Sequence, residues 1–571
     1  MAESTTSQGS SRSAEIRPLI LVLVVAFALR LILAFLETEV GIDSVHYILM
    51  GDNIAHGRSF DTWNTTGGRW LLPPTFPLLV ALFRLMGAGL EWSGQLAAIT
   101  AGTFLLIPLY FLTRRLFTPT TALIAVWIAA FYPILVDYSV VILTENLFAA
   151  LVLSMLVFLH RSLSEKGTLW DSFRSGVFLG LAFLTKTFGI FLLLFLALSY
   201  MFGRGGRSKL SPAKQLGFSI VGFLILAVPY WTGLHQYTGR WVIDGKGEGQ
   251  AARIFATSLD DEHIDPRYSG ELTPDGTDFE INVNPSGLTP QHAPLGELAL
   301  MYPAKYLRKL IRIYQDFPYT PTYPNNVLLL YLFPSMLLGL GIFTGGGRWT
   351  ERHSDRFLLY WLCPFVFGIP LVFVEVRYYI PVVPLLVPFM ARGIEEVAGW
   401  MVERFSGVWK IFEKGAFGKA IAIVIAVFIL LALPKLTYKI THWSDPMVSY
   451  NPRKVAAQWL LAYDYHPKRI MEYGHSVSFY SDAQSILIPQ GDLHDVIRIA
   501  RKYDVEFLSL DEFYVLRAHR RPEIEFLFDT DLRPPPELER LYLDPDYPGL
   551  KHVIYRIRTP EEIAKTFLAA R

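Results

Sequence analysis

Apolar runs close to the length of a membrane-spanning helix recur along the chain from residue 18 to about residue 435. A helix needs roughly 20 apolar residues to cross the hydrocarbon core of a bilayer. Because lipid offers the backbone no hydrogen bonds, these runs are predicted to be helices. The first run, 18–35, is too long for the core of a typical signal peptide and lacks a small-residue cleavage site, so we expect it to be retained as a span. The pattern predicts a polytopic α-helical membrane protein.

The charges of the connecting loops determine the predicted number of spans. Twelve apolar runs can be counted, but residues 73–90 open with two prolines and carry Arg84 in their middle. If this segment lies along the outer surface of the membrane, the lysines and arginines of the loops gather on the cytoplasmic side, as the positive-inside rule requires. The sequence then predicts eleven spans, at 18–36, 94–113, 120–136, 145–160, 175–186, 188–203, 213–233, 326–344, 357–374, 378–394 and 419–435.

This topology divides the chain into three predicted parts. Residues 1–17 form a cytoplasmic tail, and residues 18–435 form a membrane domain with two large outer loops, 37–93 and 234–325. In residues 436–571 the apolar runs are short and alternate with helix-like stretches, which is typical of a small soluble α/β domain. With the amino terminus in the cytoplasm, this domain faces the outside.

Composition agrees with a membrane protein and narrows the chemistry. The 571 residues are 52% hydrophobic and only 18% charged, whereas soluble domains average about 25% charged. The net charge of +1 gives no sign of nucleic-acid binding, and Cys363 is the only cysteine, so no internal disulfide can form. The histidines lack metal-ligand spacing, and no nucleotide-binding loop is present, so neither a metal nor a cofactor is indicated.

Four ionisable residues stand at the edges of apolar runs, and the predicted topology places all of them at the outer face. They are Asp43, Glu145, Lys186 and Arg377. A charged side chain at the bilayer centre costs roughly 2.5–3.5 kcal/mol on insertion scales, so such residues are candidates for function. Arg30, inside the first span, is instead expected to form a salt bridge within the bundle.

Each of the four also has a structural explanation. Asp43 would cap a surface helix, and Glu145 would open an apolar helix, where an acid is favourable without any function. Lys186 would extend its amine to the membrane surface, and Arg377 would pair with Glu375. Two acids and two bases on one face, however, could form a single site.

The order of several motifs resembles the GT-C glycosyltransferase superfamily over nearly the whole chain. The resemblance rests on Asp43 and Tyr47 after the first span, Pro73-Pro74 before the second, and the strings GLAFLTKTFGIFLL, RYYIPVVPLLVPFMARG and, in the tail, NPRKVAAQWLLAY. The chain is most similar to the branch that holds the protein O-mannosyltransferases and the lipid A aminoarabinose transferases. It departs from many relatives at Ser44, where they have Glu, and at Leu72, where they have His.

The resemblance implies an inverting transferase of the plasma (inner) membrane, with its site and C-terminal domain facing the periplasm or exterior. A sugar would pass from a polyprenyl-phosphate donor to a hydroxyl of a protein, of lipid A or of another envelope glycan. Asp43 would be the general base, an effect that typically contributes 10²–10⁴-fold, and Glu145 would orient the acceptor or share that role. The cations Lys186 and Arg377, together with Tyr378, would hold the phosphate. Further candidate substrate contacts are His46, Tyr47 and Arg69.

Two other classes of function stay open at this point. A transporter or flippase of lipid-linked saccharide would show internal repeats and ionisable groups near mid-membrane. The sequence shows no such repeat, and the marked charges lie at one face. A structural protein of an envelope-assembly complex would tolerate neutral replacements of Asp43 and Lys186.

Overall fold

In the structure, a computed structural model, the chain divides into two compact units. The first comprises Met1–Glu37, Gly94–Tyr230 and Lys309–His442, and the second comprises Thr38–Ser93, Trp231–Arg308 and Trp443–Arg571. The structure describes residues 4–37, 40–58, 72–202, 208–239, 241–243, 270–272, 277, 279–281, 300, 303–304, 307–308, 311, 327–344, 352–368, 376–405, 415–438, 451–489, 491–518, 521–544 and 551–569.

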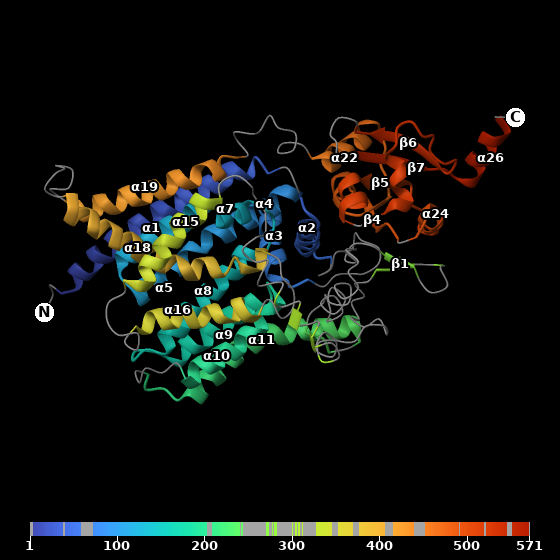
Figure 1. Cartoon of the computed structure of the whole chain (residues 1–571). Helices are drawn as coiled ribbons and strands as arrows, with labels where there is room; N and C mark the ends of the chain where they lie inside the picture. The colour runs from blue at the N-terminus through green and yellow to red at the C-terminus, as the bar shows by residue number, and fades with distance from the viewer. Residues whose placement is uncertain are drawn as a thin grey trace. The chain divides into compact units, whose positions relative to one another are not determined.

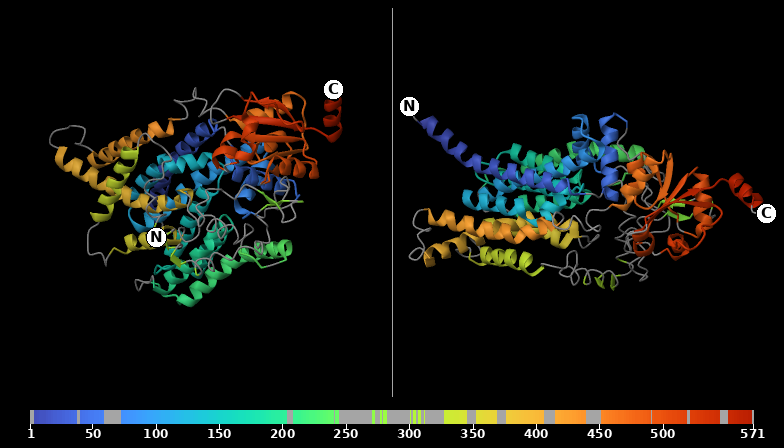
Figure 2. Two further views of the ribbon diagram at one scale, coloured as in Figure 1. Left: turned by 45° about the vertical axis from the view of Figure 1, so that its right-hand side comes forward. Right: turned by 90° about the horizontal axis from the view of Figure 1, so that it is seen from above.

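The first unit is a bundle of apolar helices (Figures 1 and 2). Its helical segments, of which α4 and α11 have one end in the second unit, are α1 (Ser4–Ala34), α4 (Leu90–Phe104), α5 (Leu106–Leu116), α6 (Pro119–Phe131), α7 (Pro133–Val140), α8 (Glu145–Ser162), α9 (Leu169–Phe183), η1 (Thr187–Ile190), α10 (Phe191–Phe202), α11 (Pro212–Thr238), α15 (Val327–Phe343), α16 (His353–Cys363), η5 (Pro364–Gly368), η6 (Val376–Tyr379), α18 (Val382–Phe405) and α19 (Ala416–Leu436).

Several of these helices have the length and composition of membrane spans. Among the described residues five qualify, or six if the bent pair α6–α7 counts as one span: Ile16–Ala34, Leu90–Leu116, Glu145–Ser162, Pro212–Gln236 and Ala416–Pro434. The other predicted spans coincide with shorter or more polar helices. The count of eleven spans therefore stays a prediction.

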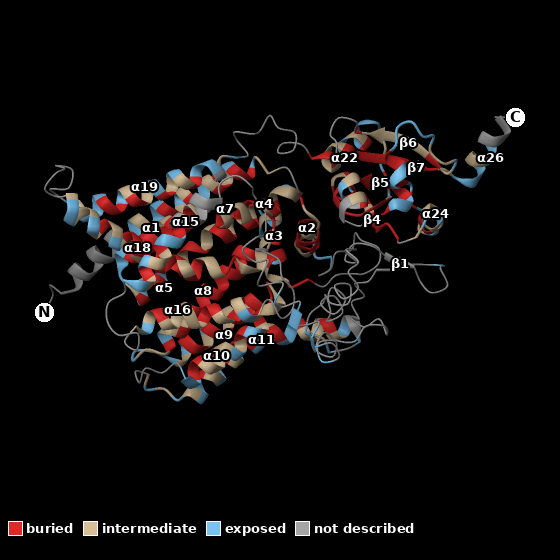
Figure 3. Cartoon of the chain, viewed as in Figure 1, coloured by how far each residue is buried: buried red, intermediate tan, exposed pale blue. Residues whose placement is uncertain are grey.

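The burial pattern is that of an integral membrane protein. Large apolar side chains such as Val24 and Ile32 on α1, and Leu430 on α19, are exposed, although other apolar residues of the same helices are buried (Figure 3). A helix that is apolar on all sides is stable at a surface only where that surface meets lipid rather than water.

The predicted span 120–136 is broken in the structure. Helix α6 ends at Phe131 and α7 begins at Pro133, with a bend of 55° between them. Proline has no N–H to donate to the preceding turn, and its ring clashes with the carbonyl four residues earlier. The sequence prediction treated this run as one continuous helix and overlooked the proline.

The expected salt bridge of Arg30 is wrong. Its guanidinium is fully buried, and the partners that the structure describes are a hydroxyl and two carbonyls. Nε donates to Ser139 Oγ at 3.0 Å, and Nη1 donates to the carbonyl oxygens of Ala26 and Ala130 at 3.1 Å each. The Ala130 carbonyl lies in the last turn of α6, where the break before Pro133 interrupts the helical hydrogen bonds.

Close helix contacts in the bundle depend on glycine. A Cβ added to Gly341 of α15 would lie 1.8 Å from the Phe389 carbonyl oxygen of α18, and one added to Gly393 would lie 2.0 Å from the Leu337 carbonyl oxygen of α15. Without side chains at these positions the two backbones approach closely, as is common between membrane helices.

In the second unit, the first outer loop contains two short packed helices, α2 (Ile42–Ala55) and α3 (Thr75–Leu85). A Cβ on Gly51 of α2 would lie 2.6 Å from Val80 Cβ of α3. Arg84 Nε lies 2.7 Å from Asp52 Oδ1, which joins the two helices by an ion pair. With 11 residues, α3 is too short to cross a membrane.

The C-terminal part of the second unit contains a five-stranded sheet of order β4-β3-β5-β7-β6. Strands β3, β4 and β5 are parallel, and β7 runs antiparallel to both β5 and β6. The strands are β3 (Arg469–Glu472), β4 (Gln484–Leu487), β5 (Phe507–Asp511), β6 (Leu538–Leu543) and β7 (His552–Ile557), and a separate antiparallel pair consists of β1 (Gly270–Leu272) and β2 (Phe279–Ile281).

Two apolar cores pack on this sheet. One core contains Val496 and Ile499 of α24, and the other contains Ala456 and Leu460 of α22. The helical segments around the sheet are α22 (Pro452–Ala462), α23 (Ser476–Ser481), α24 (Leu493–Lys502), η8 (Phe513–Ala518), α25 (Pro522–Glu525), η9 (Phe526–Phe528) and α26 (Pro560–Ala569). The strand-length runs of the sequence correspond to β3, β4 and β5.

The contact between α15 and α18 gives a stability test with a control in the same helix. Gly393→Ala should lower the thermal midpoint of the purified protein, because overpacking a close contact costs about 1–3 kcal/mol. Gly399→Ala, where an added Cβ would meet no described atom within 4 Å, should hold or slightly raise the midpoint, since alanine favours helix by about 1 kcal/mol. Equal midpoints for the two variants would show that this glycine contact does not contribute to stability.

Candidate active site

Glu145 is the buried acid of the candidate site. It lies in the first turn of α8, after the N-cap Thr144, and its side chain is 1% exposed. The partial positive charge at a helix N-terminus favours a carboxylate there. The predicted start of an apolar helix at Thr144 and Glu145 is therefore observed.

Lys186 supplies the nearest cation. Helix α9 ends at Phe183, and Lys186 stands with extended backbone immediately before the single 3₁₀ turn η1. Its Nζ donates to Glu145 Oε1 at 2.8 Å, with 17% of the lysine side chain exposed. A charged amine within apolar sequence needs an anionic partner, because burying an unpaired charge is costly. Glu145 is that partner for Lys186.

Arg377 and Tyr378, on the short segment η6 before α18, complete the group. Arg377 Nε lies 3.8 Å from Glu145 Oε1. The Tyr378 ring lies under both cations, with its centroid 4.4 Å from Lys186 Nζ and 5.5 Å from Arg377 Cζ. A cation over an aromatic face within about 6 Å is attracted to it. We name these four residues the Glu145 cluster. Glu375, the expected partner of Arg377, lies outside the described residues.

The two carboxylate oxygens of Glu145 differ in their contacts. Both cations approach Oε1 of Glu145, whereas the buried Oε2 accepts no hydrogen bond from any residue that the structure describes. An unsatisfied buried acceptor is costly, so this oxygen is suited to accept a hydrogen bond from a bound molecule.

Asn146 fixes the beginning of α8. Its Nδ2 donates to Ser139 Oγ at 2.8 Å and to the Leu135 carbonyl oxygen at 3.0 Å, both in α7. Ser139 Oγ is also the acceptor for Arg30. Through Ser139, the residue next to Glu145 is connected to α7 and to Arg30 of α1. Sequence reasoning missed this connection, because no pattern marks a buried serine as the shared partner of an asparagine and an arginine.

The other predicted site residues belong to the second unit or are not described. Asp43 lies in the first turn of α2, two residues after the N-cap Gly41. His46 is 4% and Tyr47 7% exposed, and their rings contact His475 (5.0 Å between centroids) and Phe76 (5.4 Å). Their predicted substrate contacts, and the grouping of Asp43 with the Glu145 cluster, stay predictions.

Arg69 lies outside the described residues. Among those that the structure does describe, no group of three or more His, Cys, Asp or Glu side chains could hold a metal ion.

Comparison with solved structures identifies the fold. Over 95% of this chain and 98% of the other, the structure matches ArnT from Cupriavidus metallidurans bound to undecaprenyl phosphate, with a TM-score of 0.55 and 13% identity. It also matches the Archaeoglobus fulgidus oligosaccharyltransferase in complex with Zn and sulfate, over 87% of this chain and 68% of that one, with a TM-score of 0.52 and 13% identity. The chain has a GT-C glycosyltransferase fold.

A family model agrees with this GT-C assignment. Residues 72–232 match the family described as dolichyl-phosphate-mannose-protein mannosyltransferase, a segment that includes Glu145 and Lys186 but neither Asp43 nor Arg377. No curated protein sequence matches the chain. The predicted resemblance to the GT-C superfamily, in the branch of ArnT and the protein O-mannosyltransferases, is confirmed.

The Glu145–Lys186 contact predicts coupled effects on stability. Lys186→Met removes the hydrogen bond to a buried carboxylate, which should cost about 1–3 kcal/mol and lower the thermal midpoint. Adding Glu145→Gln removes the buried charge as well, so the double variant should be more stable than the sum of the two single changes predicts. Strictly additive midpoint shifts in a double-mutant cycle would show that the two side chains do not interact.

Proposed function

We propose that this protein transfers a sugar from a polyprenyl-phosphate donor to a hydroxyl group of an envelope acceptor, at the outer face of the plasma (inner) membrane and with inversion at the anomeric carbon. The observation that carries the proposal is the Glu145 cluster, in which two cations and an aromatic ring gather around one buried carboxylate within a GT-C fold. Its formal charge is +1, which suits an anionic ligand.

The cations fit a phosphate in complementary ways. Arg377 presents a planar guanidinium that can bond two phosphate oxygens at once, whereas Lys186 is a point charge on a flexible stem. Arg377 lies 3.8 Å from Glu145 Oε1, which is beyond hydrogen-bonding distance, so its fork is not committed to that carboxylate. The similar ArnT structure is one bound to undecaprenyl phosphate, which supports a lipid phosphate as the ligand.

Residues of this chain can supply both the base and the charge stabilisation that the transfer step needs. The acceptor oxygen attacks the anomeric carbon while the bond from that carbon to the phosphate oxygen breaks. The hydroxyl proton passes to the carboxylate of Asp43, and the negative charge that develops on the leaving polyprenyl phosphate is stabilised by Lys186 and Arg377. Attack opposite to the leaving group inverts the anomeric carbon. No nucleotide is required, because the lipid carries the activated sugar.

Glu145 would orient a substrate rather than act as the base. Its Oε1 contacts both cations, and its buried Oε2 accepts no hydrogen bond from any described residue. A hydroxyl of the bound sugar or acceptor could donate to Oε2. The orienting role, one of the two roles that the resemblance implied for this residue, is therefore the better supported.

The donor site can be tested with one variant that keeps the positive charge and one that removes it. Arg377→Lys keeps the charge but loses the fork, and Lys186→Ala loses a charged hydrogen bond worth about 1.5–3 kcal/mol, so both should raise the donor KM by about 10-fold or more. Arg392→Lys is the matched control, because this arginine is paired with Asp355 at 2.8 Å and should keep the wild-type donor KM. Unchanged donor KM in both test variants would remove the two cations from the site.

The base can be tested in the same assay. Asp43→Asn keeps the size of the side chain, but it cannot take a proton, so turnover should fall roughly 10²-fold or more while donor KM changes little. Glu525→Gln is the control, since that acid is exposed on α25, and it should keep its turnover. Near-normal turnover of Asp43→Asn would contradict the assignment of Asp43 as the base.

A further inference from the structure

The α2 helix, which carries Asp43, is held by the C-terminal sheet domain within the second unit. The rings of His46 in α2 and His475 meet edge to face, with centroids 5.0 Å apart and planes at 64°. Ser476 Oγ donates to the Val40 carbonyl oxygen at 3.3 Å, just before α2 begins. Both the amino end of α2 and its first turns therefore contact the domain.

The contact occurs after β3, where the order of the strands in the sheet reverses. After β3 the chain passes to β4 on one side of it and then crosses to β5 on the other side. In open α/β sheets, the crevice outside the carboxyl ends of strands at such a reversal is where ligands bind. Here the residues that follow β3, Tyr473 to Ser476, contact α2 of the same chain.

His475 adopts a backbone conformation that side chains other than glycine rarely take. Its φ is +56° and its ψ is 5°, at the N-cap of α23. A residue with a Cβ is strained in this left-handed region and keeps the conformation only where its surroundings impose it. His475 is also buried, with 5% exposure. A strained backbone at a buried residue often marks a functional position.

Hydrogen bonds on both sides impose that conformation. His475 Nδ1 lies 2.6 Å from Ser485 Oγ on β4. The buried Glu472 carboxylate accepts the backbone N–H groups of Val477 (3.0 Å) and Ser478 (2.8 Å), which holds the first turn of α23. Burial lowers the pKa of His475 well below its usual value, so its ring is neutral.

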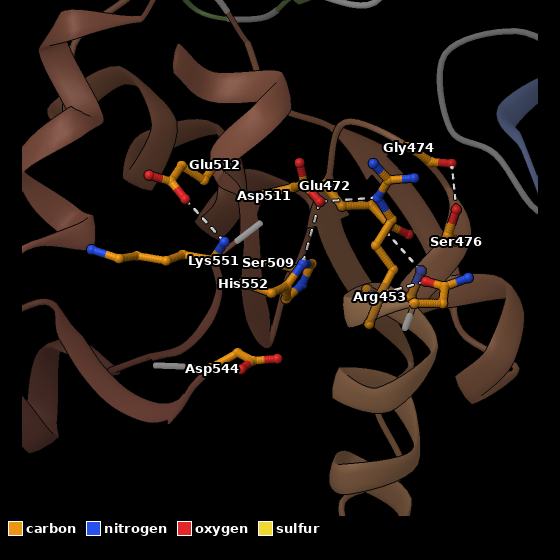
Figure 4. Close-up of polar contacts among 12 residues, drawn as sticks. Arg453, Glu472, Gly474, Ser476, Ser509, Asp511, Glu512, Asp544, Lys551 and His552 are labelled. Carbon is orange, nitrogen blue, oxygen red and sulfur yellow. Dashed lines mark hydrogen bonds and ion pairs between the residues drawn. The ribbon is translucent and has the colours of Figure 1, made fainter. Parts of the chain in front are cut away.

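The interior of the domain beside this turn is also polar and ordered (Figure 4). Arg453 Nε pairs with Asp511 Oδ2 at 3.0 Å, at the carboxyl end of β5. Ser509 Oγ and His552 Nε2 are hydrogen bonded at 2.8 Å. Paired polar side chains thus lie at the carboxyl end of β5 and join it to α22 and β7.

A second contact holds the other end of the first outer loop. Lys454 Nζ of α22 lies 2.9 Å from Glu91 Oε2. The Tyr480 hydroxyl of α23 donates to Glu91 Oε1 at 3.4 Å. Segments α22 and α23 therefore contact the loop just before α2 and again at Glu91.

His46 and Asp43 lie on the same helix, so the position of one determines the position of the other. Residues three apart on a helix lie on the same face, so Asp43 stands one turn before His46. The close contact of Gly51 with Val80 and the ion pair of Asp52 with Arg84 keep α2 packed on α3. Anchoring α2 at His46 thus determines where the carboxylate of Asp43 lies.

We propose that His475 is a positioning residue of the transferase: through its left-handed turn, the C-terminal domain holds α2 and thereby sets the position of the Asp43 carboxylate. This inference rests on the proposed role of Asp43 as the base. It assigns the C-terminal domain a part in turnover, without any contact between His475 and the substrate.

The experiment uses full-length protein in nanodiscs and two readouts, hydrogen exchange of the α2 amides and steady-state transfer. His475→Gly keeps the left-handed backbone but removes the ring and the bond to Ser485. It should speed exchange across α2 and lower turnover, each by about five- to tenfold, with unchanged donor KM. His475→Asn, which tolerates the left-handed region and can still bond Ser485, should recover part of both. Asp504→Gly, another left-handed residue (φ +48°), between α24 and β5, is the control and should match wild type.

A double-mutant cycle separates positioning from general stability. In an Asp43→Asn background there is no carboxylate to position, so His475→Gly should lower turnover by less than about twofold. Equal loss in both backgrounds would overturn the positioning role, and so would wild-type exchange of α2 in His475→Gly, or faster exchange with wild-type turnover.

The cycle also distinguishes this inference from the proposed function. Wild-type turnover of Asp43→Asn alone would overturn the base role of Asp43. The exchange of α2 amides in His475→Gly would still decide whether His475 holds that helix.

Discussion

The arrangement of the candidate site depends on one buried contact, the pairing of the Glu145 carboxylate with Lys186. It joins the start of α8 to the joint between α9 and η1, and the approach of Arg377 brings in the segment before α18. Removing two charges from water is expensive, and a buried ion pair often does no more than offset that cost. Such a pair is therefore poor evidence for stability alone.

Each of the two units holds its own proposed functional residues through buried polar groups. The first unit supplies the cations and the buried acid, and it fixes that acid through Asn146, Ser139 and Arg30. The second supplies Asp43 on a short helix whose contacts with His475 and Ser476 tie it to the sheet domain. In both units the residue proposed to act on substrate is positioned by a buried polar group one or two contacts away. Preorganisation of this kind is what general-base and electrostatic catalysis require.

Much of this could be predicted from the sequence, because the physical signals are local. Long apolar runs indicated the helices, and charges at their edges indicated Glu145, Lys186 and Arg377, which the structure brings together. Strand-length runs corresponded to β3, β4 and β5. The prediction did not pair Glu145 with Lys186, since the two lie 41 residues apart and only tertiary packing joins them.

Two other features had no local sequence signal, and a third had one that was overlooked. The partners of Arg30 are a hydroxyl and carbonyls, which no charge pattern marks, so a salt bridge was the natural but wrong expectation. The left-handed backbone of His475 arises from contacts on both sides of it, with Ser485 and with α2. The break at Pro133 was visible in the sequence and was overlooked.

The proposed reaction breaks the sugar–phosphate bond of a lipid donor and joins the sugar to an acceptor. The most direct measurement reconstitutes the purified protein in liposomes with a polyprenyl-phosphate sugar and an envelope fraction, and follows both products by mass spectrometry. For a transferase we expect free polyprenyl phosphate to appear in step with glycosylated acceptor. An intact lipid-linked sugar that crosses the bilayer, with no polyprenyl phosphate released, would contradict it and show a flippase instead.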